Sequence, residues 1–289
     1  MKTSRGFVLA AVLLGFFAVV GCQPIEYPPT PNTNLDVCVR NPECTNTIAV
    51  GHRGTGSFNL LAPENTLGAY DMAWRMGADS IEVDPRDTLD GVPIIMHDDT
   101  VDRMTDGTGS VAEMTLGQIK ALNVPSINPA VPTQQVPTFA EALALLREKT
   151  LVYIDIKSAD VPGLVRVIEE QGMLNAAYLL IGSIDEGLQA RTQNPTVALM
   201  PKIYTEADVL AYIDALSPIL MFEIEYADAT PEVVSLIHSY NIKIHMDALW
   251  VYDAAGINGY TTLEDRGTDS IQTDRLEVLV PFVRGLTDR

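Results

Sequence analysis

The stretch "SIEVDPRDTLDGVPIIMHD", residues 80–98, contains two short β-rich runs that both end in polar side chains. The runs are "SIEVD" (80–84) and "PIIMHD" (93–98), and the link between them is too short to hold a helix. Its "LDG" at 89–91 is typical of a turn. Because side chains alternate along a strand, Glu82 and Asp84 lie on one face of the first run. The stretch therefore predicts two strands that carry acids and a histidine to their ends.

The same pattern continues outward along the chain. From residue 48 onward, β-rich runs alternate with amphipathic segments, which predicts a parallel sheet with helices packed outside it. We expect strands at 48–51, 80–84, 93–98, 151–157, 177–183, 197–203, 220–225, 242–247 and 270–274. We expect helices at 65–77, 138–149, 161–171, 185–193, 205–216, 230–240 and 274–284.

The predicted fold class is α/β, a (β/α)8 TIM barrel formed by residues 48–289. About 240 residues are enough for one domain of this kind. Nine strand candidates are one more than eight-fold closure needs, so one of them must lie outside the barrel. Residues 98–137 are rich in Gly, Pro and Thr, and we expect a small irregular insertion there, after the third strand and on the side where the strands end.

Polar residues recur where four of the predicted strands end. In a TIM barrel these carboxyl ends form the active-site face. Polar pairs two residues apart in apolar strands are costly unless a partner or ligand satisfies them. The residues are His52 and Arg53, Glu82 and Asp84, His97 and Asp98, and Asp155 and Lys157.

The residue types at these ends suit metal-assisted chemistry on a phosphate ester. Glu82, Asp84 and Asp155 form a hard-oxygen set that suits Mg²⁺ or Ca²⁺. The histidines His52 and His97 suit acid–base work near neutral pH. Arg53 and Lys157 supply the positive charge that a phosphate needs. Any one of these residues alone is more often a solvated edge or a satisfied core residue, and it is their recurrence at four strand ends that favours a site.

Several motifs resemble the glycerophosphodiester phosphodiesterase family. They are "GHRG…PENT", "GADSIEVDPRDTLDGVPIIMHDDTVDRMTDGTG", "VPTFAEAL", "VYIDIK" and "GTDSIQTD", in order from about residue 49 to residue 275. The resemblance implies a TIM barrel, a divalent cation, and hydrolysis of glycerophosphodiesters to glycerol 3-phosphate and an alcohol.

Carried over position by position, the resemblance gives each residue a role. His52 and His97 become the acid–base pair, and Arg53 becomes a phosphate contact. Glu82 and Asp84 become metal ligands, with Asp155 as the third. Lys157 matches the family's lysine two residues further on.

The sequence also departs from the family pattern. The family usually has Glu at Asp155, so this ligand is one methylene shorter. The late Trp-Thr-Val-Asn-like segment is replaced by "IHMDAL", where His245 stands for the aromatic residue and Asp247 lies near the usual Asn. Loss of the ring weakens apolar contact with glycerol, and the carboxylate repels a strongly anionic substrate; alternatively His245 is simply a core residue.

Six other residues receive secondary interpretations. Glu64 and Asn65 are expected to cap a helix start rather than to take part in catalysis. Glu223 and Glu225 are further candidates on the barrel interior. Trp74 and Trp250 are expected to pack rather than to contact the substrate.

The N-terminus predicts export. Lys2 and Arg5 precede an apolar run from Phe7 to Val20 that is too short to span a bilayer comfortably, as in a secretory signal at 1–21. The ending "VVGC" resembles a bacterial lipoprotein signal, which makes Cys22 the lipidated residue and a membrane anchor. An ordinary cleaved signal with an incidental cysteine is the alternative.

Residues 22–47 are Pro-rich and predict an extended tether between the anchor and the barrel. Cys38 and Cys44 lie inside it. In an exported protein such a close pair indicates a local disulfide. Metal binding by the pair is disfavoured because no histidine or further cysteine lies nearby.

The charge of the chain disfavours nucleic acid as a partner. The formal net charge is −19, and removal of residues 1–21 takes away two basic and no acidic residues, which leaves −21. A nucleic-acid-binding surface should be basic. An anionic substrate would need a local cation or metal against this field. The oligomeric state is left open.

Three rival functions remain open from the sequence. One is a related barrel phospholipase that acts on intact or lyso-phospholipid or on a polymer such as teichoic acid. Another is a noncatalytic phosphoglyceride-binding lipoprotein. A metal-dependent sugar isomerase is weaker, because it gives Arg53 and Lys157 no task.

Overall fold

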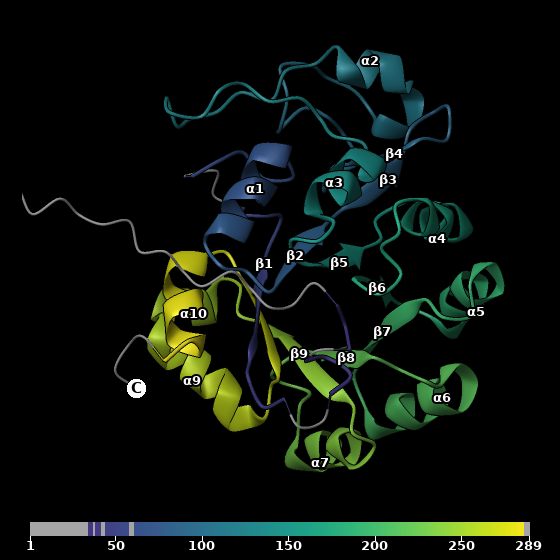
Figure 1. Cartoon of the computed structure of the whole chain (residues 1–289), viewed down its shortest axis with the longest axis vertical. Coiled ribbons are helices and arrows are strands. Elements are labelled where there is room, and N and C mark those ends of the chain that lie inside the picture. Colours follow the sequence, from purple (N-terminus) through teal and green to yellow (C-terminus); the bar gives the residue numbers. More distant parts are fainter. Residues whose placement is uncertain (1–33, 37, 42–43, 58–60, 286–289) are drawn as a thin grey trace, which may run out of the picture.

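Eight parallel strands close into a barrel in the computed structural model, which describes residues 34–36, 38–41, 44–57 and 61–285 (Figure 1). The order around the barrel is β1-β10-β9-β8-β7-β6-β5-β2. The predicted TIM barrel is therefore confirmed. Its strands are β1 (Ile48–Gly51), β2 (Ser80–Val83), β5 (Leu151–Asp155), β6 (Ala177–Ile181), β7 (Ala198–Ile203), β8 (Met221–Ile224), β9 (Lys243–Asp247) and β10 (Ser270–Thr273).

Helices surround the barrel on the outside (Figure 1). Most begin at a Ser, Thr or Asp whose side chain accepts a hydrogen bond from the first turn, as at Thr66, Asp160 and Thr230. The helices are α1 (Leu67–Arg75), α3 (Phe139–Leu146), α4 (Val161–Glu170), α5 (Ile184–Gln193), α6 (Glu206–Leu216), α7 (Pro231–Ser239), α8 (Val251–Ala255), α9 (Ile257–Arg266) and α10 (Leu276–Val283). The sequence did not predict α8 and α9, although α9 buries Tyr260 and Leu263 on one face.

The ninth strand candidate lies outside the barrel. Residues 93–98 form only β4 (Pro93–Ile95), which pairs antiparallel with a short β3 (Pro85–Asp87) that the sequence did not predict. In the barrel, β2 pairs directly with β5. The hairpin therefore leads the chain away from the barrel wall and starts the insertion.

The insertion is more ordered than the predicted irregular segment. It contains a 3-10 turn η1 (Val111–Glu113) and a short helix α2 (Leu116–Lys120). It also has its own small apolar core, which is separate from the main core of the barrel. The insertion follows β4 in the chain and so lies between the barrel strands β2 and β5, beside the carboxyl end of β2.

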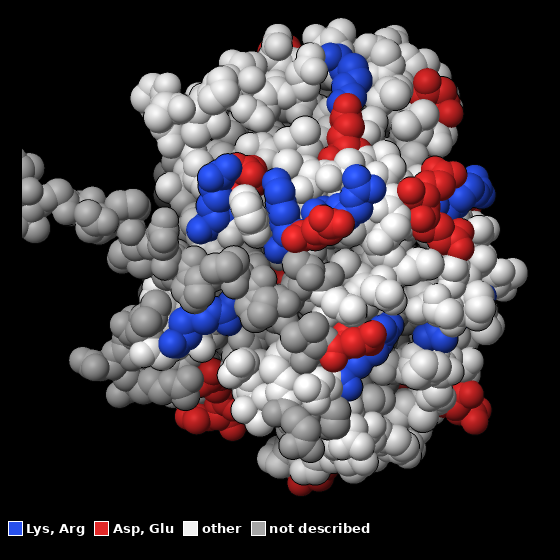
Figure 2. All heavy atoms as spheres, viewed as in Figure 1, with Lys and Arg blue, Asp and Glu red and all other residues white. Residues whose placement is uncertain are grey.

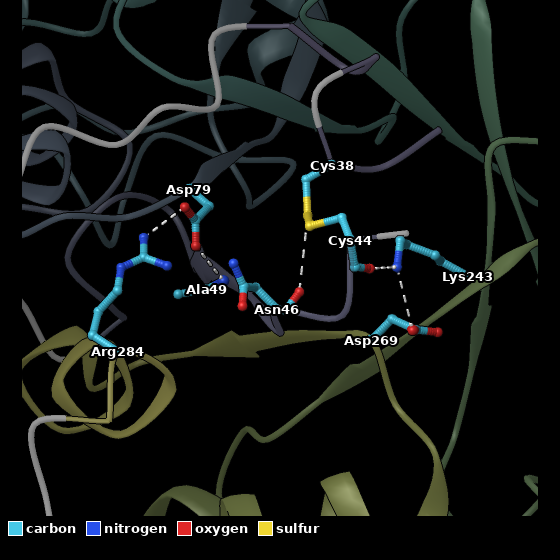
Figure 3. The surroundings of a disulfide bond; sticks show 8 residues. All are labelled: Cys38, Cys44, Asn46, Ala49, Asp79, Lys243, Asp269 and Arg284. Carbon is cyan, nitrogen blue, oxygen red and sulfur yellow. Dashed lines mark hydrogen bonds and ion pairs between the residues drawn. A yellow bond between two sulfur atoms is a disulfide. The ribbon is translucent and has the colours of Figure 1, made fainter. Parts of the chain in front are cut away.

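The described part of the predicted tether packs against the amino ends of the strands. Leu35 and Val39 are buried in the main core. Cys38 and Cys44 are joined in a disulfide, and Lys243 at the start of β9 donates to the Cys44 carbonyl at 2.9 Å (Figure 3). Cys22 and the predicted signal lie outside the described residues. The described residues between 34 and 47 therefore pack against the end of the barrel at which the strands begin.

On the face shown in Figure 2, several Lys and Arg side chains lie beside Asp or Glu side chains. Among the helices of the described residues, none is both long enough and apolar enough to cross a bilayer.

Candidate active site

Three acidic side chains meet at the carboxyl ends of β2 and β5. Glu82 and Asp84 come from β2 and the residue after it, and Asp155 ends β5, which pairs with β2. One carboxylate oxygen from each residue lies within 4.8 Å of the others. The structure thus brings together the three predicted metal ligands, in the one such group found among the described residues.

The charges of this cluster are unbalanced without a cation. Burial raises the pKa of Glu82, and the neighbouring Asp84 and Asp155 raise it further, well above the ordinary value. Burial alone would also raise the pKa of Asp84, but Lys157 and Arg53 outweigh it and the pKa is lowered. Asp84 Oδ1 is buried without a hydrogen bond, although Lys157 Nζ lies 3.2 Å away. These residues fit a hard divalent cation, since the donors are oxygens with unused acceptor capacity.

His52 lies directly after β1 and is held by Asp274. Its Nδ1 lies 2.7 Å from Asp274 Oδ1, and the residue is 7% exposed. Asp274 also accepts from the backbone and hydroxyl of Ser57 at 2.7 and 2.9 Å. Burial would raise the pKa of Asp274, but these hydrogen bonds outweigh it and lower the pKa. An ionised Asp274 fixes the tautomer and orientation of His52.

The close approach of the loop after β1 to Asp274 depends on Gly56. Gly56 has φ +96, and a Cβ there would stand 2.4 Å from the Asp274 carbonyl oxygen. The loop after β1 can therefore pass close to the end of β10 only with glycine at this position. Asp274 was not among the predicted site residues, although it ends the strand run "SIQTD" (270–274) just as the predicted acids end theirs.

His97 is positioned from two sides. Its Nδ1 lies 2.9 Å from Asp98 Oδ1, and Arg103 in turn pairs with Asp98 at 2.6 Å. Arg86 on β3 donates through Nε and Nη2 to the His97 carbonyl at 3.1 and 2.7 Å. Arg86 also donates to Ser158 after β5 at 3.0 Å. The hairpin thus fixes His97 beside the barrel, a role for Arg86 that the sequence did not reveal.

Glu64 and Asn65 belong to the site network, and the prediction that they cap a helix was wrong. Thr66 is the N-cap of α1. Glu64 is 1% exposed and accepts from Arg53 at 2.8 Å, while Asn65 Nδ2 donates to Asp84 at 2.6 Å. Asn65 has φ +56, which turns its side chain toward the strand ends instead of along the helix. The Tyr70 hydroxyl donates a hydrogen bond to Asn65 Oδ1 at 2.8 Å, which fixes the orientation of the amide.

The predicted cations stand next to the acids. Arg53 donates its backbone N–H to Glu82 Oε2 at 2.7 Å, and its Nε lies 3.5 Å from Asp84. Lys157 Nζ lies 2.5 Å from Asp155. Burial lowers the pKa of Lys157, but Asp84 and Asp155 outweigh it and raise the pKa, so the amine is charged.

A family model described as the "Glycerophosphoryl diester phosphodiesterase family" matches residues 52–278. The chain belongs to this family. The human "Glycerophosphodiester phosphodiesterase 1" is 44% identical over 162 residues, which cover 54% of this chain and 47% of the human protein. The chain thus spans about half the length of that relative.

Two bacterial proteins match more of the chain. The "Glycerophosphodiester phosphodiesterase" of Bacillus subtilis (strain 168) is 32% identical over 227 residues, which cover 68% of this chain and 75% of that protein. The crystal structure of the glycerophosphodiester phosphodiesterase from Agrobacterium tumefaciens str. C58 superposes with a TM-score of 0.68 at 26% identity. It covers 82% of this chain and 99% of that one.

In the barrel, His245 is a core residue. It is fully buried, packs edge-on against Tyr153 with ring centroids 5.3 Å apart, and places Nδ1 2.9 Å from Ser270. Glu223 also points into the interior, where Tyr153 donates to it at 2.7 Å. Glu225 is exposed and pairs with Lys202 at 3.2 Å.

The two tryptophans of the chain differ in burial. Trp74 packs partly buried against the main core, as predicted, with Lys149 Nζ 4.8 Å from its ring centroid. Trp250 is 72% exposed, so the prediction that it packs was wrong. A γ-turn, in which Val251 N–H donates to the Leu249 carbonyl at 2.9 Å, explains the difference. It gives Trp250 φ +67 and ψ −85, a strained conformation that directs the ring away from the core.

Proposed function

We propose that the protein is a metal-dependent phosphodiesterase that hydrolyses glycerophosphodiesters to glycerol 3-phosphate and an alcohol. One observation carries the proposal: Glu82, Asp84 and Asp155 meet beside Arg53 and Lys157, and the residue before Arg53 is a histidine held by its own carboxylate. Family membership and the named activities of the relatives support it.

The chain's own residues divide the work of the reaction. His52, oriented by Asp274, and His97, oriented by Asp98, are the two imidazoles that the reaction would use. One takes the proton of the glycerol 2-hydroxyl as its oxygen attacks phosphorus, and the other protonates the departing alcohol oxygen. Water then opens the cyclic phosphate with the two proton transfers reversed. The acid and base roles of the two histidines stay unassigned.

The acidic cluster and the two cations serve the phosphate. A divalent metal, Mg²⁺ or Ca²⁺, held by Glu82, Asp84 and Asp155 would neutralise charge on the nonbridging oxygens. With the carboxylates balanced in this way, Arg53 and Lys157 would be able to contact those oxygens. Asn65 keeps Asp84 oriented through its 2.6 Å hydrogen bond.

We also propose that the protein is exported and anchored through a lipid on Cys22. Gln23 rather than Asp after Cys22 favours an outer-membrane location by the usual bacterial sorting pattern. The Cys38–Cys44 disulfide agrees with an oxidising compartment.

Metal removal should abolish activity. We expect EDTA-treated protein to hydrolyse sn-glycero-3-phosphocholine and sn-glycero-3-phosphoethanolamine about 10³-fold more slowly, since the charge on phosphorus would lack its main counter-charge. Mg²⁺ and Ca²⁺ added back separately, with released alcohol measured, identify the ion. If neither ion restores hydrolysis, the carboxylate-metal assignment is wrong. If the metal-replete protein hydrolyses no diester at all, the binding-lipoprotein alternative is correct.

A lipid substrate is a second candidate because Trp250 and Val251 are 72% and 71% exposed just beyond β9. Apolar side chains next to the strand ends suit an acyl chain or a membrane surface. The substrate panel therefore includes a lysophospholipid and an intact phospholipid. Activity confined to these two would replace the glycerophosphodiester assignment.

Arg86→Met should lower kcat by about 10- to 100-fold with little change in KM. The two N–H groups that hold the His97 carbonyl would be lost, and small misplacements of a catalytic group cost about this much. Arg86→Lys should recover part of the rate through one remaining donor. Steady-state kinetics on the best diester tests this, and an equal loss in Arg147→Met, an exposed residue at the end of α3, would refute a positioning role.

A further inference from the structure

The half of the barrel opening opposite the acidic cluster carries polar side chains that the proposed reaction does not use. They come from β7, β8, β9 and β10, whose register pairs Lys202 with Glu223, Glu223 with His245, and Asp247 with Gln272. Residues paired in a parallel ladder share a face, and His245 and Asp247 are two apart on one strand. These side chains therefore all point into the barrel.

One part of this group is internally satisfied. Glu223 accepts from Lys202 at 2.9 Å and from the Tyr153 hydroxyl at 2.7 Å. Lys202 Nζ also lies 3.2 Å from Glu225. An ammonium has three N–H donors, so Lys202 keeps one for a ligand.

In the other part, one atom each of His245, Asp247 and Gln272 has no hydrogen-bond partner among the described residues. Gln272 is 4% exposed, and its Oε1 accepts no hydrogen bond from the residues that the structure describes. His245, fully buried, directs Nε2 toward Asp247 Oδ1 at 3.4 Å, but neither atom makes a hydrogen bond of good geometry there. Asp247 is 28% exposed through its side chain, so its carboxylate reaches the opening. Buried polar atoms without partners are costly and commonly mark a ligand position.

This group lies beside the catalytic machinery. Gln272 is two residues before Asp274, the partner of His52, and so lies on the same face of the chain. Burial would raise the pKa of Asp247, but His245 and then the nearby His52 outweigh it and lower the pKa. A ligand whose phosphate contacts the acidic cluster would extend its organic part toward Asp247 and Gln272.

We propose that Asp247, Gln272 and Lys202 form a polyol subsite that binds hydroxyl groups of the diester substrate. The inference rests on the proposed function and specifies which part of the substrate the second half of the opening recognises. A phosphate is excluded there because the Asp247 carboxylate would repel it. A hydroxyl donates to Asp247 or Gln272 and accepts from Lys202, which matches the unused capacity of all three residues.

The polyol has two sources in a glycerophosphodiester: the glycerol that is retained and the alcohol that leaves. Three substrates separate them. Glycerophosphoglycerol has hydroxyls on both halves. The second substrate has propane-1,2-diol as the attacking half, which keeps the 2-hydroxyl but lacks the terminal one. The third has propanol as the leaving half.

The experiment measures kcat/KM for all three substrates with metal-replete wild-type protein, Asp247→Ala and Asp247→Asn. We expect wild type to lose about 10- to 100-fold on one of the two deoxy substrates, mainly through KM, because a hydrogen bond to a charged group is lost. The deoxy substrate that is hydrolysed more slowly shows whether the subsite binds the retained glycerol or the leaving alcohol. Asp247→Ala should reduce this discrimination to less than about threefold, and Asp247→Asn, which keeps an acceptor, should retain part of it.

The control is Glu206→Gln, which removes an exposed negative charge at the start of α6 on the same end of the barrel. It should discriminate as wild type does, which separates hydrogen bonding from the general field. If wild type discriminates less than threefold on both halves, or if Asp247→Ala and Asp247→Asn discriminate fully, the subsite is refuted. Absence of hydrolysis of every diester by wild type would instead refute the proposed function.

Discussion

His52→Asn should lower kcat for glycerophosphodiester hydrolysis by about 10³-fold, which corresponds to about 4 kcal/mol of transition-state free energy. Asparagine keeps a hydrogen-bonding group toward Asp274 but cannot transfer a proton near neutral pH. Since His52 is 7% exposed and 2.7 Å from Asp274, the side chain is held for one task. The substituted protein should remain folded, because the contact with Asp274 is retained.

Asp274→Asn tests the orientation of His52 separately. The isosteric change removes the negative charge that favours the Nδ1–H tautomer. We expect a smaller loss than in His52→Asn, about 10²-fold, and an altered pH profile. An altered pH dependence of kcat together with normal thermal stability would show that Asp274 acts through the His52 imidazole and not through packing.

The matched control is His238→Asn on α7, an exposed histidine that also pairs with a carboxylate, Asp269 at 3.0 Å. This variant should keep wild-type kcat, because His238 lies at the amino end of the barrel. Full activity in His52→Asn under saturating metal would remove His52 from the mechanism.

Glu82→Gln should weaken divalent-metal affinity by about 100-fold or more. The change removes one of three negative ligands, and even residues that only orient ligands commonly contribute 10- to 100-fold. Glutamine can still accept the 2.7 Å hydrogen bond from Arg53 N–H, so the loop after β1 should keep its shape. Without metal the variant should be more stable above pH 4.5, because the raised pKa of Glu82 means that folding must either bury its charge or take up a proton, and glutamine needs neither.

Titration calorimetry with Mg²⁺ and Ca²⁺ checks this prediction. The metal must displace a proton from Glu82, whose pKa is raised well above the ordinary 4.5, so wild-type affinity should increase as pH rises above that value. In Glu82→Gln this dependence should weaken. Glu223→Gln is the control, a buried carboxylate on the far side of the barrel whose loss should leave metal affinity within about twofold. Equal affinities in wild type and Glu82→Gln would place the metal elsewhere.

The strand ends were the most predictable feature of the site. His52, Glu82, Asp84 and Asp155 follow apolar runs whose period is legible in a few consecutive residues, so their common edge follows from the parallel sheet alone. Asp84 and Asp155 are 71 positions apart in the sequence, yet the β2–β5 pairing makes them neighbours. By contrast, the prediction that Glu64 and Asn65 cap a helix was wrong, because residues just before a helix commonly do so. Only the positive φ of Asn65 turns its side chain toward the strand ends.

The sequence by itself determined the alternation of strands and helices, the barrel, and the residue types at the strand ends. These are set by local periodicity and by the cost of burying polar groups. Only the tertiary structure decided the partners, which are Asp274 with His52 across 222 residues and Arg86 with the His97 carbonyl. It also set the register that places Asp247 beside Gln272. The physical reason is closure, since pairing β1 with β10 brings the two ends of the domain together, and no local pattern specifies which side chains then come within hydrogen-bonding distance.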